Sequence, residues 1–163
     1  MSEARETRRR VMNMIARGVV AESNDDNGMQ TVQLSLLHEE AKAAAERIQN
    51  YGFSSHPPAN SEAVAIFVGG GRDHALIIAL DDRASRFTGL QAGEVAIYSN
   101  EGDSIVLKRD NTVEVTTRTL VVNAEEAIEI EAPEIRIKGD IELDGNLNAT
   151  GNISAPGGSV GNG

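Results

Sequence analysis

The sequence predicts a mainly β protein in which a small N-terminal barrel precedes an intertwined β-helix. The first observation is an apolar–polar–apolar triplet that recurs every six to eight residues. Its members are Ile105/Leu107, Val113/Val115, Leu120/Val122, Ile128/Ile130, Ile135/Ile137, Ile141/Leu143, Leu147/Ala149 and a half-member at Ile153. A period of two residues is typical of strands with one buried face. The second observation is that the 65 residues after Tyr98 contain no aromatic residue, so slim aliphatic side chains must fill the interior.

The repeats also predict the number of chains. An isolated hairpin of such short strands is only marginally stable in water. A monomeric solenoid needs about 20 or more residues per coil, which exceeds the observed spacing. Three chains around one axis would bury the aliphatic positions and leave no long free edge. We therefore expect a homotrimer in which residues 99–154 form a triple-stranded β-helix and residues 155–163 a flexible glycine-rich tail.

The N-terminal segment, residues 1–18, is predicted to be a docking helix. Within it, residues 3–17 carry an apolar stripe of Val11, Met12 and Ile15, and Gly18 ends the helix. The segment has a net charge of +3, whereas the whole chain has a formal net charge of −10. A solvated terminal helix without a docking role fits the charge run equally well.

Residues 19–98 are predicted to form an OB-fold-like domain. We expect strands at Val19–Val20, Thr31–Leu36, Ala63–Val68, His74–Leu80 and Val95–Tyr98. The turn Asp25–Gly28 has hairpin chemistry. Residues 39–49 (EEAKAAAERIQ) are helix-prone, because three consecutive alanines are flanked by Glu, Lys and Arg. That segment is expected to be a helical excursion from the sheet.

Composition argues against several functions. An acidic chain lacks the basic face that nucleic-acid binding requires. The absence of cysteine excludes disulfides, thiolate metal sites and a cysteine nucleophile. No window approaches the ~20 apolar residues of a membrane span. Residues 11–16 are too short and polar for the core of a secretory signal, so we expect synthesis in the cytoplasm without export.

Two motifs that could carry chemistry have simpler structural explanations. Gly69–Gly71 is followed by a predicted strand and has no nearby lysine, which favours a hairpin turn over a phosphate-binding loop. Asp81 and Asp82 are adjacent, and neighbours on a strand point in opposite directions. A turn or a surface pair with Arg83 or Arg86 is therefore favoured over acid–base or metal chemistry.

The histidines do not form a recognisable site either. His38, His56 and His74 lie in three different segments, and none has a partner at metal-ligand spacing. Ser54, Ser55 and His56 lack the third partner and the oxyanion hole of a catalytic triad. We therefore predict no catalytic, cofactor-binding or metal-binding residues and no enzymatic activity.

The middle of the chain resembles a known family. The motifs that carry the resemblance are, in order, Tyr51–Pro58 (YGFSSHPP), Ser61–Ala63, Gly69–His74 (GGGRDH), Asp82–Arg83 with Arg86, Gly93–Tyr98 (GEVAIY) and Gly102. Their order and spacing resemble those of the baseplate central spikes of Mu-like contractile-tailed phages. These proteins are also called baseplate assembly protein V or tail-puncturing proteins. The resemblance covers residues 10–120 by motif and the remainder by architecture.

The resemblance implies a virion structural protein of the tail baseplate, assembled in the host cytoplasm. It implies an OB-fold followed by a triple-stranded β-helix, in a homotrimer on the tail axis below the baseplate hub. In this family the needle is driven through the host outer membrane when the sheath contracts. The N-terminal segment would then contact the hub or the tape-measure protein.

One departure from the family concerns its apical metal. Many members end in an apex where a His-x-His pair from each chain binds iron. Here no His follows His74, so we do not expect that ion. Residues 154–163 fit either a flat end capped by a separate tip protein or a frayed terminus.

Two other functions remain open at the level of sequence. A receptor- or glycan-binding fibre module would need exposed aromatics, and the chain has only five aromatic residues. A glycan-cleaving enzyme would need two carboxylates held across a sugar cleft.

Overall fold

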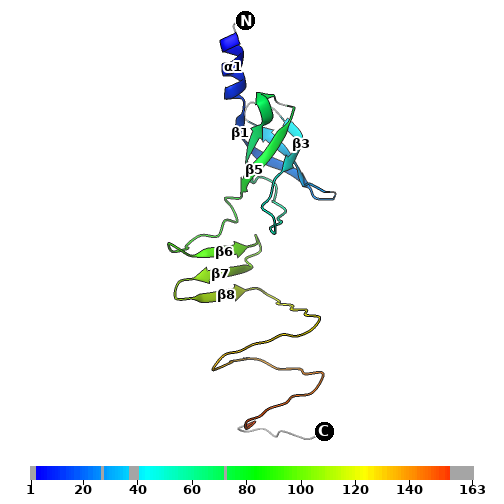
Figure 1. Ribbon diagram of the computed structural model, residues 1–163, viewed down its shortest axis with the longest axis vertical. Helices are drawn as coiled ribbons and strands as arrows, with labels where there is room; N and C mark the ends of the chain where they lie inside the picture. Colours follow the sequence, from blue (N-terminus) through cyan, green and yellow to red (C-terminus); the bar gives the residue numbers. More distant parts are fainter. Residues whose placement is uncertain (1–2, 27, 37–40, 72, 155–163) are drawn as a thin grey trace. The chain divides into compact units, whose positions relative to one another are not determined.

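The computed structural model describes residues 3–26, 28–36, 41–71 and 73–154. The chain divides into two compact units, Met1–Leu120 and Val121–Gly163. All helices and strands assigned in the described ranges lie in the first unit (Figure 1). The predictions for His38 and for residues 155–163 fall outside these ranges. None of the helices described is long and apolar enough to cross a membrane.

The N-terminal half forms a closed five-stranded barrel, so the predicted small β-barrel is confirmed (Figure 1). The strands are β1 (Ile15–Asn24), β2 (Thr31–Leu36), β3 (Ala41–Arg47), β4 (Glu62–Phe67) and β5 (Ala75–Asp81). They follow one another around the barrel in the order β1-β2-β3-β5-β4. The β3–β5 pair is parallel and the other pairs are antiparallel. A closed path of five strands is the architecture expected of an OB-type barrel.

The barrel core follows from strict alternation along the strands. In β4, residues Ala63, Ala65 and Phe67 are buried, whereas the residues between them are partly exposed. The buried apolar cluster consists of Val20, Val32, Leu34, Leu36, Ala45, Ala63, Ala65, Phe67, Ala75 and Ile77. Phe67 is 1% exposed and is the largest side chain in this cluster, which also contains four small alanines.

The helix predicted over residues 39–49 is wrong. Residues 41–47 form β3, which pairs with β2 on one side and with β5 on the other. Ala45 is buried in the core, and Arg47 N donates to Gln30 O at 2.8 Å. Helix propensity is a weak preference, and the pairing on both edges overrides it here. Consequently β3, and not Val95–Tyr98, is the fifth strand of the barrel.

The N-terminal helix is shorter than predicted. Helix α1 spans Glu3–Met12, and β1 begins at Ile15. The last turn closes where Asn13 N donates to Arg9 O and Met14 N donates to Val11 O. Ile15 belongs to the barrel because it pairs with Ile66 of β4, and β-branched residues favour such strands. The predicted stripe therefore keeps only Val11 and Met12 on the helix.

The triple-glycine segment is a hairpin connection, as predicted, and it also receives the end of α1. It joins the antiparallel strands β4 and β5 through the short 3₁₀ turn η1 (Val68–Gly70). Gly70 is buried and has φ +72°, and a Cβ there would lie 2.4 Å from the Arg10 carbonyl oxygen. Phe67 N donates to Met14 O at 2.8 Å. Only a glycine permits this close approach of backbone to backbone.

After the barrel comes a three-stranded antiparallel meander, which we call the collar (residues 95–116). Its strands are β6 (Val95–Tyr98), β7 (Ser104–Lys108) and β8 (Thr112–Thr116). They pair in the order β6-β7-β8 (Figure 1). The strands predicted at Val95–Tyr98, Ile105/Leu107 and Val113/Val115 are therefore confirmed.

The second unit has a different character. In its described part, residues 121–154, no helix or strand forms within the chain, and Figure 1 shows a winding trace without arrows. We call residues 120–153, which contain the remaining repeats, the shaft segment. Because no strand is assigned in its described residues, the predicted triple-stranded β-helix stays a prediction.

Candidate interaction surfaces

One face of the collar consists entirely of aliphatic side chains. The register aligns Val95 with Leu107 and Leu107 with Val113 in one row, and the second row is shifted by two residues along each strand. Partners across an antiparallel pair point to the same side of the sheet. The resulting grid face comprises Val95, Ile97, Ile105, Leu107, Val113 and Val115. These six side chains are 43–62% exposed, so the single chain leaves this face uncovered.

The opposite face of the collar is polar or already covered. Val106 and Ser104 are buried there, and the ring of Tyr98 lies 5.9 Å from that of Phe87. Lys108 Nζ pairs with Glu114 Oε2 at 2.6 Å on the same side. A sheet with one apolar and one polar face normally packs its apolar face against another layer. Since the polar face is satisfied within the chain, the grid face is the one that requires a partner.

Two carboxylates brace the collar across its turns. Glu94 accepts from Gln91 N at 2.8 Å and from Arg109 N at 3.2 Å. These hydrogen bonds lower the pKa of Glu94, and the backbone N–H of Gln91 makes the largest contribution. Asp103 accepts from Thr117 Oγ1 at 2.8 Å and from Ser99 Oγ at 3.0 Å. The hydroxyl of Thr117, and then that of Ser99, lower the pKa of Asp103. Glu94 thus connects the bend before β6 to the bend after β7. Asp103 connects the β6–β7 turn to the residue that follows β8.

The shaft segment exposes a second set of aliphatic side chains. They are Leu120, Val121, Val122, Ile128, Ile130, Ile135, Ile137, Ile141, Leu143, Leu147 and Ile153. Each of these side chains is 54–70% exposed. Single exposed apolar residues are common on protein surfaces, but a long series of them is not. The described single chain therefore leaves a long periodic series of aliphatic side chains uncovered.

Helix α1 offers a third surface, of a different chemistry. None of its residues is buried, and Val11 and Met12 are exposed. Its last turn carries Arg9 and Arg10, and Arg10 pairs with Glu6 at 3.0 Å. The backbone contact at Gly70 fixes the C-terminal end of the helix, while Val11 and Met12 at that end and the arginines along the helix stay exposed to solvent.

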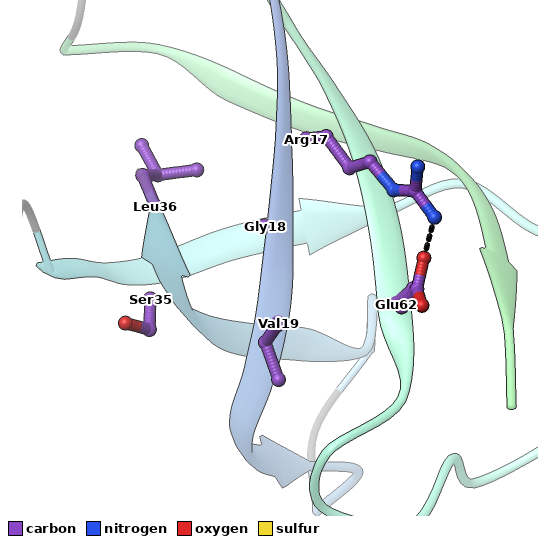
Figure 2. A pocket seen from close by; sticks show the side chains of 6 residues that line it. All are labelled: Arg17, Gly18, Val19, Ser35, Leu36 and Glu62. Atoms are coloured by element: carbon purple, nitrogen blue, oxygen red, sulfur yellow. Dashed lines mark ion pairs between the residues drawn. The ribbon is translucent and has the colours of Figure 1, made fainter. Parts of the chain in front are cut away.

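The barrel surface has a groove of about 460 Å³ over the middle of β1. It is lined by Arg17, Gly18, Val19, Ser35, Leu36 and Glu62. Figure 2 shows the Arg17 side chain reaching along the rim to Glu62, with which it forms an ion pair. Glu62 is also paired with Arg83, so its charge is compensated from two sides. The groove is therefore lined by a charge-compensated carboxylate and by apolar side chains.

The structure places Asp81 and Asp82 in structural roles. Asp82 closes a turn by accepting from Ser85 N at 3.1 Å, from Ala84 N at 3.3 Å and from the Ser85 hydroxyl. The Ser85 hydroxyl is the main reason that the pKa of Asp82 lies below its usual value. Asp81 lies 3.7 Å from Arg86. The predicted turn and surface pair are confirmed.

The other chemical candidates are not brought together. Ser55 Oγ accepts from Arg47 at 2.9 Å and lies 3.4 Å from Gln49 Oε1. His56 and His74 are exposed on different parts of the barrel. Within the described part of the chain, no three His, Cys, Asp or Glu side chains are placed to hold a metal ion. The prediction that the protein works without a cofactor therefore remains a prediction.

Sequence reasoning missed two features of these surfaces. It did not place Val95 and Ile97 on the same face as the first two repeats, although their alternation around Ala96 was a signal. It also gave no role to Gly70 beyond a turn. The close approach to Arg10 has no local signal other than the glycine run itself.

Comparison with known proteins identifies the family of the chain. A family model described as "Bacteriophage Mu Gp45, N-terminal" matches residues 17–84, which span most of the barrel. The baseplate puncturing device gp45 of Escherichia phage Mu is 38% identical over 135 residues, covering 83% of this chain and 68% of the relative. The Mu-like prophage FluMu protein gp45 of Haemophilus influenzae is 33% identical over 137 residues, covering 80% of this chain and 74% of the relative. This chain belongs to the Mu-like gp45 family of phage baseplate proteins.

Proposed function

We propose that the protein is the central spike of a contractile tail baseplate, a trimeric needle that punctures the host outer membrane when the sheath contracts. The name of the phage Mu relative, a baseplate puncturing device, supports this role. The role is mechanical and needs no catalytic site.

One observation carries the proposal: the regular aliphatic side chains of the shaft segment are exposed in a single chain. Three copies wound around one axis would bury all of them. Burial of apolar surface contributes roughly 25 cal/mol per Å², so a long series of Ile and Leu side chains stabilises such a trimer strongly. The 65 residues after Tyr98 lack aromatic rings, as a narrow interior requires.

The proposed partners follow from the remaining surfaces. Helix α1 is exposed and carries a basic last turn, whereas the whole chain has a net charge of −10. An acidic or apolar surface of the baseplate hub or the tape-measure protein would complement it. A separate protein that caps the far end of the shaft completes the assembly that we propose.

The oligomeric state and the location test this function. At micromolar concentration, equilibrium sedimentation should give the mass of three 17.3 kDa chains. A gold label on the protein should lie at the tip of the tail in electron micrographs. Ile130→Asp, which would place three carboxylates in the shaft interior, should abolish infection, whereas Glu129→Ala should leave it unchanged. A monomeric protein, or a label along the sheath, would contradict the proposal.

A second function, receptor or glycan binding by a trimeric fibre-like module, is favoured by one observation. Tyr51 and Phe53 are exposed on the loop between β3 and β4, and amphipathic aromatic side chains commonly contribute to binding surfaces. A Tyr51→Ala/Phe53→Ala double variant separates the two functions. It should lower adsorption of phage to cells if the loop binds a receptor, and it should leave adsorption unchanged for a purely mechanical spike.

A further inference from the structure

The collar and the shaft segment both expose aliphatic side chains, but they differ in what one chain has already built. In the collar, backbone hydrogen bonds of two antiparallel pairs hold the grid face in place within a single chain. In the described part of the second unit, no strand pairs with another strand of the same chain. The collar therefore presents a finished surface before any association, and the shaft segment does not.

Side-chain hydrogen bonds make the collar more rigid than three short strands alone would be. Asp103 links the β6–β7 turn to Thr117 after β8, and Glu94 links the approach to β6 with Arg109 after β7. Fixing the backbone of one residue costs about 1–2 kcal/mol of conformational entropy. A surface that is ordered beforehand does not incur this cost again on binding.

A second copy of this chain is the partner that fits the grid face. None of its six side chains is charged, whereas the ion pair of Lys108 and Glu114 lies on the opposite face. The apolar pattern also continues without a break, because Leu120 follows Val115 by five residues. A second copy carries the same repeat, so it offers aliphatic side chains at the same spacing to the collar and to the shaft segment.

We propose that the collar is a distinct trimerisation surface that brings three chains into register before their shaft segments wind together. This inference rests on the trimer proposed above and adds which surface forms it first. Three grid faces turned toward one axis would stack their rows of side chains in matching layers. The shaft segments would then start from aligned positions, so each chain would meet its neighbours in the correct register. A period-two pattern needs such alignment, because a shift by one residue exposes every buried side chain.

A matched pair of substitutions in the full-length chain tests this inference. Ile105→Asn changes the centre of the grid face, and Ile141→Asn makes the same change in the shaft segment. Both side chains are exposed in the single chain, so neither substitution removes a core contact of the barrel. Glu114→Gln, on the opposite face of the collar, serves as the control. Circular dichroism verifies that all three variants retain their strands.

We expect Ile105→Asn to raise the concentration for half-dissociation of the trimer at least 100-fold in sedimentation. Ile141→Asn should stay trimeric and refold with the association rate of the unsubstituted protein. Its shaft should nevertheless be cut faster by trypsin at Lys138, because the winding is loosened. Glu114→Gln should match the unsubstituted protein in every measurement.

Other outcomes have separate meanings. If Ile105→Asn stays trimeric, or if Ile141→Asn becomes monomeric or associates more than tenfold more slowly, the collar is not a separate first surface and the inference is overturned. The trimeric spike would still stand in those cases. A monomeric unsubstituted protein would overturn the trimer itself, and with it this inference.

Discussion

The glycine run between β4 and β5 allows a substitution series in which the structure predicts three different costs. Gly69 has φ +68° and open space where a Cβ would lie. Gly70 has φ +72°, and its Cβ would lie 2.4 Å from the carbonyl oxygen of Arg10 in α1. Gly71 has an ordinary φ of −85° and open space around its Cβ position. The three positions therefore separate backbone strain from collision with the helix.

The expected free energies follow directly. A residue with a Cβ loses about 1–2 kcal/mol in the left-handed region, so Gly69→Ala should cost that amount. Gly70→Ala should cost at least about 1 kcal/mol more, because the end of α1 must move away from the barrel as well. Gly71→Ala should be neutral or stabilise by up to about 1 kcal/mol, since alanine restricts the unfolded chain.

Thermal denaturation at a fixed protomer concentration measures this series, since association makes the melting temperature depend on concentration. For a chain of this size each kcal/mol corresponds to roughly 2–4 °C. Removing residues 1–12 deletes the carbonyl that Gly70→Ala would strike. In the truncated chain Gly69→Ala and Gly70→Ala should therefore cost the same. Equal costs in the full chain, or a difference that survives the truncation, would refute the proposed contact with Arg10.

Two further predictions concern the helix and the collar. Deletion of residues 1–12 should lower the melting temperature by about 3 °C or less, because no residue of α1 is buried. The same deletion should prevent incorporation of the protein into tails in an assembly assay. If the shortened chain fails to trimerise, α1 is a structural element and not a docking helix. Because the folded pKa of Asp103 lies below its ordinary value of 3.8, its stabilisation is complete above that value and is lost as pH falls through the folded pKa. Acid titration of the melting temperature should show this loss, and Asp103→Asn should reduce it.

The barrel was predictable from sequence where alternation and turn chemistry agreed. The strands β2, β4 and β5 and the hairpin turn before β2 all carry local signals that match the final pairing. The strand β3 does not, because its alanines and charged residues favour a helix in isolation. Its identity depends on edges offered by β2 and β5, and β5 lies about 30 residues further along the chain. No local pattern contains that information.

The C-terminal end of α1 could not be predicted from the local sequence either. Ile15 fits the apolar stripe of a helix and the outward face of a strand equally well. Its pairing with Ile66 decides between the two, and that pairing involves a residue far along the chain. The contact at Gly70 is likewise invisible locally, because a glycine needed for a positive φ and a glycine needed for a close approach look identical in sequence.

Alternation of apolar and polar residues along a strand does not distinguish the barrel from the interaction surfaces. A period of two residues states that one face of a strand is buried, and it is the same whether the covering layer comes from the same chain or from another. Ala63, Ala65 and Phe67 in β4 recur at every second position, as do Ile105 and Leu107 in the collar. Only the structure shows that β4 has its inward residues enclosed by its own barrel, whereas the grid face remains open. The sequence thus indicates aliphatic faces in both the collar and the shaft segment, and the structure shows that, within the described residues, only the collar builds its face by strand pairing inside one chain.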